Sequence, residues 1–398
     1  MDRRDAHEIA DLGQMLRHIG REQGTSRADL ARLTGRSRST VTQRAETLHE
    51  LGLVTEAGYA PSGGGRKGQL LRLNAGLGLV MTADLGATQA RLAVSDFAGT
   101  ELAARTEDLI IDEDPGRVLG RAEELLAGLL SVAGHEAREV LMIVVGLPAP
   151  VEFSTGTAVK PPLMRGWDGY SVPDYFADRR YPLGTVVDND VNLMALGEHA
   201  KNEAYSGLDN LLFIKIGTGI GCGIIVDRKL YRGANGAAGD IGHIRVPGSD
   251  ELCRCGNLGC LEAIASGHAL AQRLARARPG TRTARDVVAL VAAGDPQARQ
   301  YIRAAGQHIG EVLAAMVSFA NPSAIVLGGT LAHSDEALLA GIRSGIYDRA
   351  LPLATRSLPI ETSKLKNRAG TEGAIALAQQ RALSAEGIAA LLRAANPR

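Results

Sequence analysis

Three apolar runs that end in glycine turns constrain the fold of this chain more than any other feature. They lie at residues 81–86, 211–219 and 325–330, and from about residue 76 other apolar runs alternate with Ala-rich helical stretches. That alternation predicts an α/β fold. Because the bare backbone of a glycine turn can approach phosphate oxygens, three such turns at wide spacing predict a nucleotide cleft between two lobes. The residues expected at these loops are Asp84, Gly86, Thr88, Gly217, Thr218, Gly219, Gly328 and Gly329.

Residues 1–75 follow a different pattern, which predicts a domain separate from residues 76–398. Apolar side chains recur there at helical spacing in three segments, and a turn that contains Gly35 separates the last two. Two helices joined in this way predict a helix-turn-helix. Two strand-like runs, 53–56 and 69–73, then enclose a Gly-rich loop. This hairpin predicts the wing of a winged helix-turn-helix.

The third helical segment carries residues that we expect to contact DNA. Its buried side would be Val41, Ala45 and Leu48, which turns a polar face outward. In the major groove Gln can bond adenine and Arg can bond guanine, and basic residues of the Gly-rich loop could reach a minor groove. The alternative is a solvated polar face. The residues expected to contact DNA are Arg38, Ser39, Thr40, Gln43, Arg44, Arg66 and Lys67.

The charge of the chain is balanced overall but not locally. Lys and Arg number 44 and so do Asp and Glu, so the whole molecule offers no general attraction for nucleic acid. Residues 27–72, however, contain eight basic against four acidic residues. With 398 residues, 45% of them apolar, the chain should divide into two or three domains. The start lacks a signal-peptide core and no run is long enough to span a bilayer, so we expect a cytoplasmic protein without a membrane partner.

Four cysteines cannot form a disulfide framework in a chain of this length, and three of them lie within eight residues. His243 with Cys253, Cys255 and Cys260 makes a set of three thiolates and one imidazole, the closed tetrahedral type that holds a structural Zn²⁺. We therefore expect one zinc ion per chain. The alternative is a group of buried free thiols. Cys222 lies among glycines, and we expect it to be a small packed residue.

A polar segment between the first two glycine turns supplies a candidate catalytic base. Asp190 stands beside the amide of Asn189 within residues 186–192. A carboxylate at this place could accept a proton from a sugar hydroxyl, which is the task of the base in phosphoryl transfer. The alternative is an ordinary turn, because Asn-Asp pairs are common in turns.

Together these features resemble the ROK family, which groups bacterial sugar kinases with transcriptional repressors. The helix-turn-helix and the wing sequence 63–66 look like the repressor branch, and the chain from about residue 79 looks like the kinase-derived domain. The resemblance implies a two-lobed ribonuclease H-like, actin-type fold, with a hinge near 190–200 and a C-terminal helix that returns to the first lobe. It also implies the zinc set, with Asp190 as the base. The residues that would contact sugar are Asn189, Asp190, Asp240, His243 and Glu262.

The zinc set would also organise the sugar pocket. Asp240 lies three residues before His243, and Glu262 lies two residues after Cys260, so one ion would hold both carboxylates near each other. Carboxylate oxygens can accept hydrogen bonds from sugar hydroxyls. The ring nitrogen of His243 that the zinc leaves free could face the sugar as well.

Several positions depart from the pattern of ROK kinases. The first phosphate loop has Ala87 and Gln89 where those kinases usually have Gly and either Lys or Asn. Asp240 stands where Glu is common, and Ala149 stands where Gly is usual. Pro162 belongs to a Pro-Pro pair in a stretch where a hydrogen-bonding side chain is expected. These changes weaken the expectation of ATP and Mg²⁺ as cofactors, although the base and the second loop remain.

The features favour a DNA-binding transcriptional regulator, expected to be a repressor of carbohydrate uptake or metabolism genes, that responds to a small sugar or sugar phosphate in the cleft. Its expected partners are double-stranded operator DNA, the effector and further copies of itself, in a dimer or a dimer of dimers, because helix-turn-helix proteins usually read two half-sites. Two alternatives stay open. One is an active ATP-dependent sugar kinase with a DNA-binding appendage, and the other is a repressor controlled by a protein partner.

Overall fold

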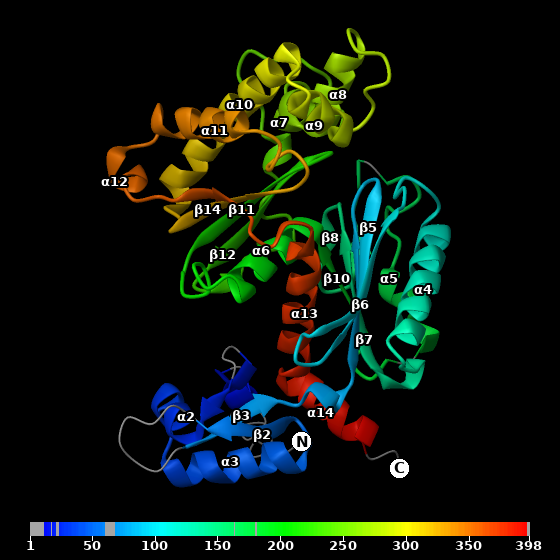
Figure 1. Cartoon of the computed structure of the whole chain (residues 1–398), viewed down its shortest axis with the longest axis vertical. Coiled ribbons are helices and arrows are strands. Elements are labelled where there is room, and N and C mark those ends of the chain that lie inside the picture. Colours follow the sequence, from blue (N-terminus) through cyan, green and yellow to red (C-terminus); the bar gives the residue numbers. More distant parts are fainter. Residues whose placement is uncertain are drawn as a thin grey trace.

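The computed structural model shows three bodies arranged along the long axis of the molecule (Figure 1). It describes residues 12–16, 18–20, 24–59, 68–162, 164–179 and 181–395. The N-terminal body lies at one end, a first α/β lobe lies in the middle, and a second α/β lobe lies at the other end.

The N-terminal body is a winged helix-turn-helix. Its helical residues 12–16 and 18–20 are followed by β1 (Thr25–Ser26), α2 (Arg27–Thr34), α3 (Arg38–Glu50), β2 (Val54–Tyr59) and β3 (Gln69–Leu73). The strands form an antiparallel sheet with the order β1-β3-β2. The short strand β1 was not predicted, because two residues are too few to show an alternating pattern.

Side-chain caps explain where the two helices of this body begin. Ser26 caps α2 by accepting a hydrogen bond from the backbone N–H of Asp29, at 3.2 Å. Ser37 caps α3 by accepting from the N–H of Thr40, also at 3.2 Å. Gly35 between the helices has a φ of 66°, a left-handed conformation that favours glycine. Short polar side chains and one glycine thus set the geometry of the turn.

The first lobe is built on a five-stranded sheet with the order β10-β7-β4-β5-β6. Strands β4, β5 and β6 form an antiparallel meander, whereas β7 and β10 run parallel to β4. The strands are β4 (Leu79–Leu85), β5 (Gln89–Asp96), β6 (Glu101–Asp108), β7 (Val140–Leu147) and β10 (Thr185–Asn189). One face packs on α4 (Pro115–Val132). Between β7 and β10 lie β8 (Val151–Glu152), β9 (Thr157–Ala158) and α5 (Val172–Tyr175).

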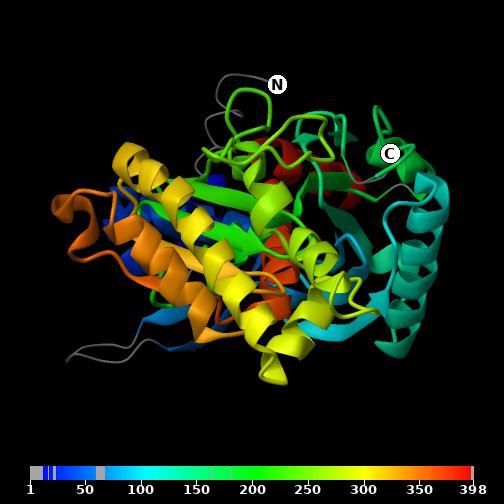
Figure 2. The same ribbon diagram turned by 90° about the horizontal axis from the view of Figure 1, so that it is seen from above.

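The second lobe is built on a sheet with the order β13-β12-β11-β14-β15. Its strands are β11 (Leu211–Ile216), β12 (Ile220–Val226), β13 (Lys229–Leu230), β14 (Ala324–Gly328) and β15 (Ile360–Thr362). Figure 2 shows long helices across this lobe. The helices of the lobe are α7 (Leu261–Ala265), α8 (Gly267–Ala275), α9 (Ala284–Ala292), α10 (Pro296–Ala320), α11 (Glu336–Tyr347) and α12 (Pro352–Thr355). Within the described residues, none of the helices is both long and apolar enough to cross a membrane.

The two sheets have the same topology. In each, three strands form an antiparallel meander, and the next two strands of the sheet add to the other side of the first strand in parallel. This is the arrangement expected for a two-lobed ribonuclease H-like fold. The backbone topology is repeated although the sequence shows no obvious repeat.

Two helices, α6 (Asp190–Lys201) and α13 (Ala369–Ala382), lie between the lobes and pack against each other (Figure 1). A Cβ at Gly197 or at Gly373 would overlap a backbone carbonyl of the other helix, so this close packing needs glycine at both positions. Val191 of α6 packs into the core of the second lobe, whereas Leu193 packs into that of the first. Helix α6 therefore connects the two hydrophobic cores.

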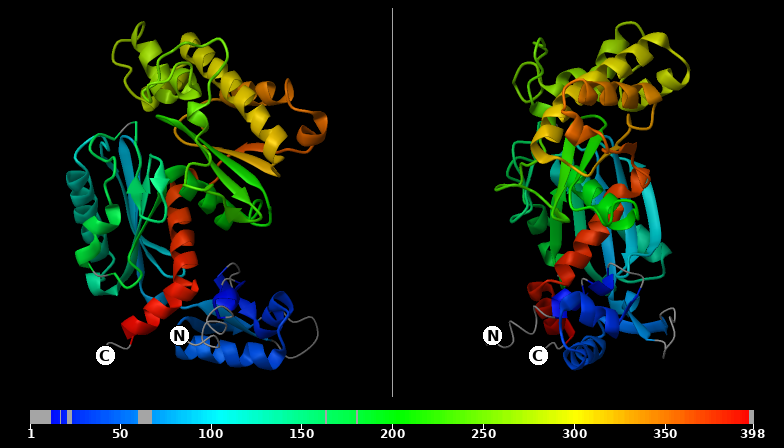
Figure 3. Two further views of the ribbon diagram at one scale, coloured as in Figure 1. Left: turned by 180° about the vertical axis from the view of Figure 1, so that it is seen from behind. Right: turned by 90° about the vertical axis from the view of Figure 1, so that its left-hand side faces the viewer.

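The N-terminal body shares one continuous hydrophobic cluster with the first lobe and the C-terminal helices. Leu16 and Leu73 of the N-terminal body, Met142 of β7 and Ile388 of α14 (Ala385–Ala395) all belong to it. Figure 3 shows α14 beside the N-terminal body in both views. Apolar packing is thus continuous across residue 75, where the sequence predicts a domain boundary.

Candidate functional site

A cleft of about 450 Å³ lies between the two α/β lobes. The five predicted sugar contacts all line it, as do most of the predicted phosphate-loop residues. Gly328 is the exception, since it lies behind the wall against the ring of Phe213. Pro148, Ala149 and Pro162 add an apolar part to the wall. The residues that the structure brings together in the cleft are Asp84, Gly86, Thr88, Asn189, Asp190, Gly217, Thr218, Gly219, Asp240, His243, Glu262 and Gly329.

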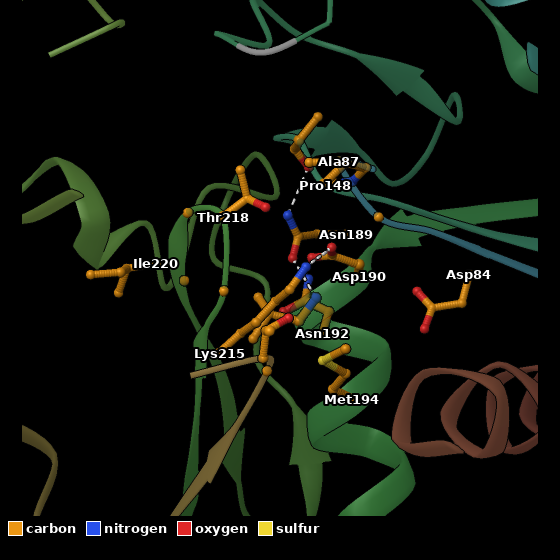
Figure 4. Close-up of a pocket in the computed structure, with 18 of the residues that line it drawn as sticks. Asp84, Ala87, Pro148, Asn189, Asp190, Asn192, Met194, Lys215, Thr218 and Ile220 are labelled. Carbon is orange, nitrogen blue, oxygen red and sulfur yellow. Dashed lines mark hydrogen bonds and ion pairs between the residues drawn. The ribbon is translucent and has the colours of Figure 1, made fainter. Parts of the chain in front are cut away.

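The start of α6 places Asn189 and Asp190 at the cleft. Asn189 caps the helix, because its Oδ1 accepts from the N–H of Val191 at 2.9 Å while its Nδ2 donates to the carbonyl of Ala149 at 2.8 Å. This cap fixes the direction in which α6 begins. Asp190 follows as the first helical residue, and its buried carboxylate forms an ion pair with Nζ of Lys215 (Figure 4).

Asp84 brings a second buried carboxylate to the same region, from the end of β4. It lies against the start of α13, where a Cβ at Gly370 would overlap the carboxylate. Burial is the largest cause that raises the pKa of Asp84 to about 7, and the charge of Asp190 raises it further, while Lys215 and Arg91 lower it. A carboxylate that titrates near neutral pH is a common feature of functional sites.

A further buried carboxylate, Asp188, lies beside the cleft and is fully engaged by fixed donors. Arg232 donates to its Oδ2 at 2.6 and 2.9 Å, and Asn192 donates to its Oδ1 at 2.8 Å. The guanidinium of Arg232 also stacks on the ring of Phe153, 3.7 Å from the ring centroid. Arg232 follows β13 in the second lobe, whereas Asp188 and Phe153 belong to the first. The ion pair therefore joins the lobes beside the cleft.

The four predicted zinc ligands lie together, and one of them, His243, lines a wall of the cleft. One ligand atom from each of His243, Cys253, Cys255 and Cys260 lies within 4.8 Å of every other. Nδ1 of His243 faces the sulfur of Cys253 at 3.6 Å, and the sulfurs of Cys255 and Cys260 are 3.7 Å apart. Three soft sulfur donors and one imidazole nitrogen in a compact group fit a tetrahedral Zn²⁺ site.

This metal-ligand cluster is continuous with the predicted sugar contacts. Cys260 is the N-cap residue of α7, so Glu262 lies in the first turn of that helix. Oε2 of Glu262 accepts from the N–H of Ile220, at 3.2 Å, which ties the cluster to the second glycine loop. Nε2 of His243, the nitrogen turned away from the thiols, lies 3.9 Å from Oδ1 of Asp240. A metal held by the cluster would therefore support both carboxylates.

The third helix of the N-terminal body presents part of the predicted DNA face to solvent. Val41 is buried, together with the other predicted core residues of α3, whereas Arg38, Ser39 and Gln43 are exposed. Thr42, which was not among the predicted DNA contacts, lies on the same exposed face. Figure 1 shows α3 at the outer end of the molecule, where a DNA duplex can approach it.

Two other predicted DNA contacts are less accessible. Thr40 and Arg44 are half-buried and line a small hollow together with Met15 of the N-terminal helical residues. The predicted wing contacts Arg66 and Lys67 lie outside the described residues. The polar face of α3 is therefore narrower than helical spacing alone predicts.

Two cationic residues of the site, Lys215 and Arg232, were not predicted. Both form ion pairs with carboxylates that are distant in sequence. The sequence does mark Lys215 as unusual, because it is the only charged residue in the apolar strand β11. Arg232 carries no such signal, since it lies in a loop where Arg is common.

Known proteins resemble both parts of this chain. The family model described as the ROK family matches residues 80–381, and the IclR helix-turn-helix domain matches residues 13–58. The xylose repressor of Caldicellulosiruptor bescii is 30% identical over 365 residues, which cover 88% of this chain and 91% of that protein. A glucokinase of Halalkalibacterium halodurans is 32% identical over 321 residues, which cover 76% of this chain and 96% of that enzyme.

A solved structure shares the fold over almost the full length. It is a ROK family transcriptional regulator described as a homologue of the Escherichia coli MLC protein. The TM-score is 0.81 at 23% identity, and the match covers 98% of this chain and all of the other. The likeness therefore extends to the N-terminal body as well as to both lobes.

Proposed function

Because this chain belongs to the ROK family, we propose that it is a DNA-binding transcriptional repressor that responds to a sugar bound between its lobes. One observation carries the proposal: a winged helix-turn-helix with an exposed polar face belongs to the same chain as a cleft lined by all five predicted sugar contacts. A relative of similar length is named a xylose repressor. The genes that it controls would serve carbohydrate uptake or metabolism.

The cleft offers the kind of groups that hold a polyhydroxylated ligand. Asn189, Asp190, Asp240 and Glu262 provide oxygen acceptors, and each carboxylate oxygen can accept more than one hydrogen bond. His243 adds Nε2, which faces the cleft side of the cluster. Ligand binding would favour one relative position of the lobes and so change DNA affinity, provided that the sugar binds the DNA-competent and incompetent states differently.

The metal in this proposal is one structural Zn²⁺ per chain. Nδ1 of His243 and the sulfurs of Cys253, Cys255 and Cys260 would hold it. These four ligands leave no open position, so the ion would organise the wall of the cleft and take no part in chemistry. In this role it supports Glu262 through α7 and Asp240 through His243.

The proposed regulator acts as a homodimer or a dimer of dimers in the cytoplasm, where its operator DNA is. A single α3 reads one half-site, and two-fold symmetric proteins read two half-sites about one helical turn apart. The exposed Arg38 and Gln43 would contact bases, while Ser39 and Thr42 would contact phosphates.

Selection of operator DNA followed by binding measurements tests the proposal. Purified full-length protein should select a palindromic site, and one sugar from a panel of free and phosphorylated hexoses and pentoses should lower its affinity for that site at least tenfold. Gln43→Ala should reduce discrimination between operator and mutated operator by about 1–3 kcal/mol, because a bidentate base contact contributes that much. Glu50→Ala, on an exposed position at the end of α3, is the matched control. Binding without sequence preference, or without response to any sugar, would contradict the proposal.

A second candidate function is phosphorylation of a sugar by ATP. It is favoured by the glucokinase relative and by the presence of Asp190 at the start of α6, beside the second glycine loop. Sugar-dependent release of ADP by the purified protein would support this candidate.

A further inference from the structure

Lys215 places a positive charge at the centre of the cleft. It is the only charged residue of β11, whose other five residues are apolar. Strand alternation turns Phe213 toward the core that contains α6, while Ile214 and Ile216 pack into the opposite core. Lys215 lies two residues after Phe213 on the same strand, so its side chain points to the same side as Phe213, toward α6, and lies nearer to the cleft. The last inward residue of this strand is thus an ammonium group instead of an apolar side chain.

Neighbouring glycines leave room for this side chain. Lys215 pairs across the sheet with Gly221 on one side and with Gly328 on the other. Its stem passes beneath the second glycine loop, where a Cβ at Gly217 would lie 3.8 Å from Cε of Lys215. The side chain is only 20% exposed. Its position is therefore set by the sheet and the loop above it.

The ammonium lies among three carboxylates. Nζ of Lys215 forms an ion pair with Oδ2 of Asp190, whose side chain is 5% exposed (Figure 4). The charges of Asp84 and Glu262 also act on Lys215. Burial lowers the pKa of Lys215, but these carboxylates outweigh that effect and hold the pKa above its usual value. The lysine therefore stays charged when the cleft is in use.

This arrangement does not fit the magnesium nucleotide that the likeness to kinases implies. A general base must accept a proton from the substrate hydroxyl, and here Oδ2 of the candidate base Asp190 is already occupied by the ammonium of Lys215. Mg²⁺ needs oxygen ligands whose negative charge is available, and here the ammonium already neutralises part of that charge. The same contact thus acts against both requirements of phosphoryl transfer.

We infer that Lys215 is a built-in cation that takes the place of a divalent metal in the cleft and keeps it a binding site without phosphoryl transfer. The inference rests on the proposed sugar-binding function and extends it: the sugar is bound without a metal or a nucleotide and leaves chemically unchanged. Asp190 then acts only as a hydrogen-bond acceptor for a sugar hydroxyl. Lys215 positions its carboxylate.

Mn²⁺ binding to full-length, zinc-loaded protein tests this inference. Free Mn²⁺ is measured by its electron paramagnetic resonance signal during titration of the wild type and of Lys215→Met. Removing the ammonium leaves the carboxylate of Asp190 without its charged partner, so the variant should bind one Mn²⁺ roughly tenfold or more tightly than the wild type. The added affinity should disappear when Asp190→Asn is combined with Lys215→Met.

Charge-matched variants separate the role of the ammonium from general damage. Lys215→Arg keeps the charge and should keep Mn²⁺ out, and Lys229→Met removes a lysine from the exposed strand β13 of the same sheet and should behave as the wild type. Equal Mn²⁺ affinity in Lys215→Met and the wild type would overturn the inference.

If Lys215→Met does not fold, two measurements on the wild-type protein test the inference instead. Sugar-dependent ADP release by the wild type with ATP and Mg²⁺, at an enzymatic rate, would overturn the inference, whereas sugar binding that is unaffected by Mg²⁺ would support it. Failure of every sugar to change operator binding would contradict the proposed sensing function, and the Mn²⁺ comparison would still report on Lys215.

Discussion

Two polar clusters of the cleft gather metal-binding side chains in opposite ways. At one wall, three thiols and the imidazole of His243 lie within 4.8 Å of one another, and none of the four carries a permanent positive charge. At the centre, Asp190 and Asp84 lie near the ammonium of Lys215, which comes from the protein itself. In the proposed function the first cluster holds a metal ion, whereas the second already contains a cation of the protein itself. The proposals therefore predict that the wall needs a metal ion and that the centre does not.

The largest effect should follow from removing the metal at the wall. Chelation, or Cys255→Ser, should release one Zn²⁺ per chain and separate α7 from the second glycine loop, because the contact between Glu262 and Ile220 is built on Cys260. Mutation of the groups that hydrogen-bond to metal ligands typically costs 10- to 100-fold in metal affinity or activity, and we expect the sugar response to fall by about that factor when the metal itself is lost. Metal analysis measures the release of zinc, and sugar-dependent operator binding measures the loss of the sugar response.

Cys222 provides the matched control for this experiment. It is a buried free cysteine on β12 and lies outside the metal-ligand cluster. Cys222→Ala should keep one zinc ion and the sugar response. A zinc-free protein with a normal sugar response would remove the distinction between the two clusters, since neither would then need a metal.

The sequence could predict the parts of the molecule in which neighbouring residues cooperate. The buried side of α3 and the grouping of Cys253, Cys255 and Cys260 both follow from short spacings. The ion pair of Lys215 with Asp190 could not be predicted, because β11 and α6 bring together residues that are 25 positions apart. Only the topology of the folded chain creates that contact.

The repeated sheet illustrates the same limit on a larger scale. Both lobes use one strand order, yet β4 has Asp84 near its end while the equivalent first strand of the second lobe, β11, has Lys215 near its end. Strand order depends on backbone connections and on which faces are buried, and many different apolar sequences satisfy it. The glycine turns therefore predicted two lobes, but they could not show that the lobes share a topology or that opposite charges would meet between them.

The next largest effect should follow from replacing Arg232, the second cationic side chain that pairs with a buried carboxylate. Arg232→Met would leave the carboxylate of Asp188 without its charged partner, and that carboxylate is 2% exposed. Breaking a buried pair on one side typically costs about 3–5 kcal/mol, and because Arg232 is partly accessible we expect the lower end of that range. Thermal unfolding should show a clearly lower midpoint, and closure of the lobes should weaken because the pair joins them.

Two further variants serve as controls for Arg232→Met. One breaks an exposed ion pair, and the other removes both charges of the buried pair. Arg245→Met breaks a pair with Asp250 in which both side chains are well exposed, and its midpoint should hardly change. Combining Arg232→Met with Asp188→Asn removes the charge left behind and should recover part of the stability. If Arg232→Met is as mild as Arg245→Met, the ion pair of Arg232 with Asp188 does not hold the two lobes together beside the cleft.

The smallest effect, and the one that compares the charges of the centre most directly, concerns Asp84 and pH. Its pKa of about 7 in the folded chain lies above the usual value of 3.8, so the folded state holds a proton that the unfolded state releases. The stabilising contribution of that proton is complete below about pH 4 and is lost as the pH rises through 7, so Asp84 should make the wild type less stable at pH 8 than at pH 5. Each unit of pKa difference corresponds to about 1.4 kcal/mol, which limits the effect to a few kcal/mol.

Asp84→Asn should remove this part of the pH dependence of the unfolding midpoint. Lys215→Met should move the decline to higher pH, since Lys215 lowers the pKa of Asp84. Equal pH dependence in the wild type and in Asp84→Asn would mean that Asp84 is already ionised at pH 5, and that the ammonium of Lys215 compensates both carboxylates instead of Asp190 alone.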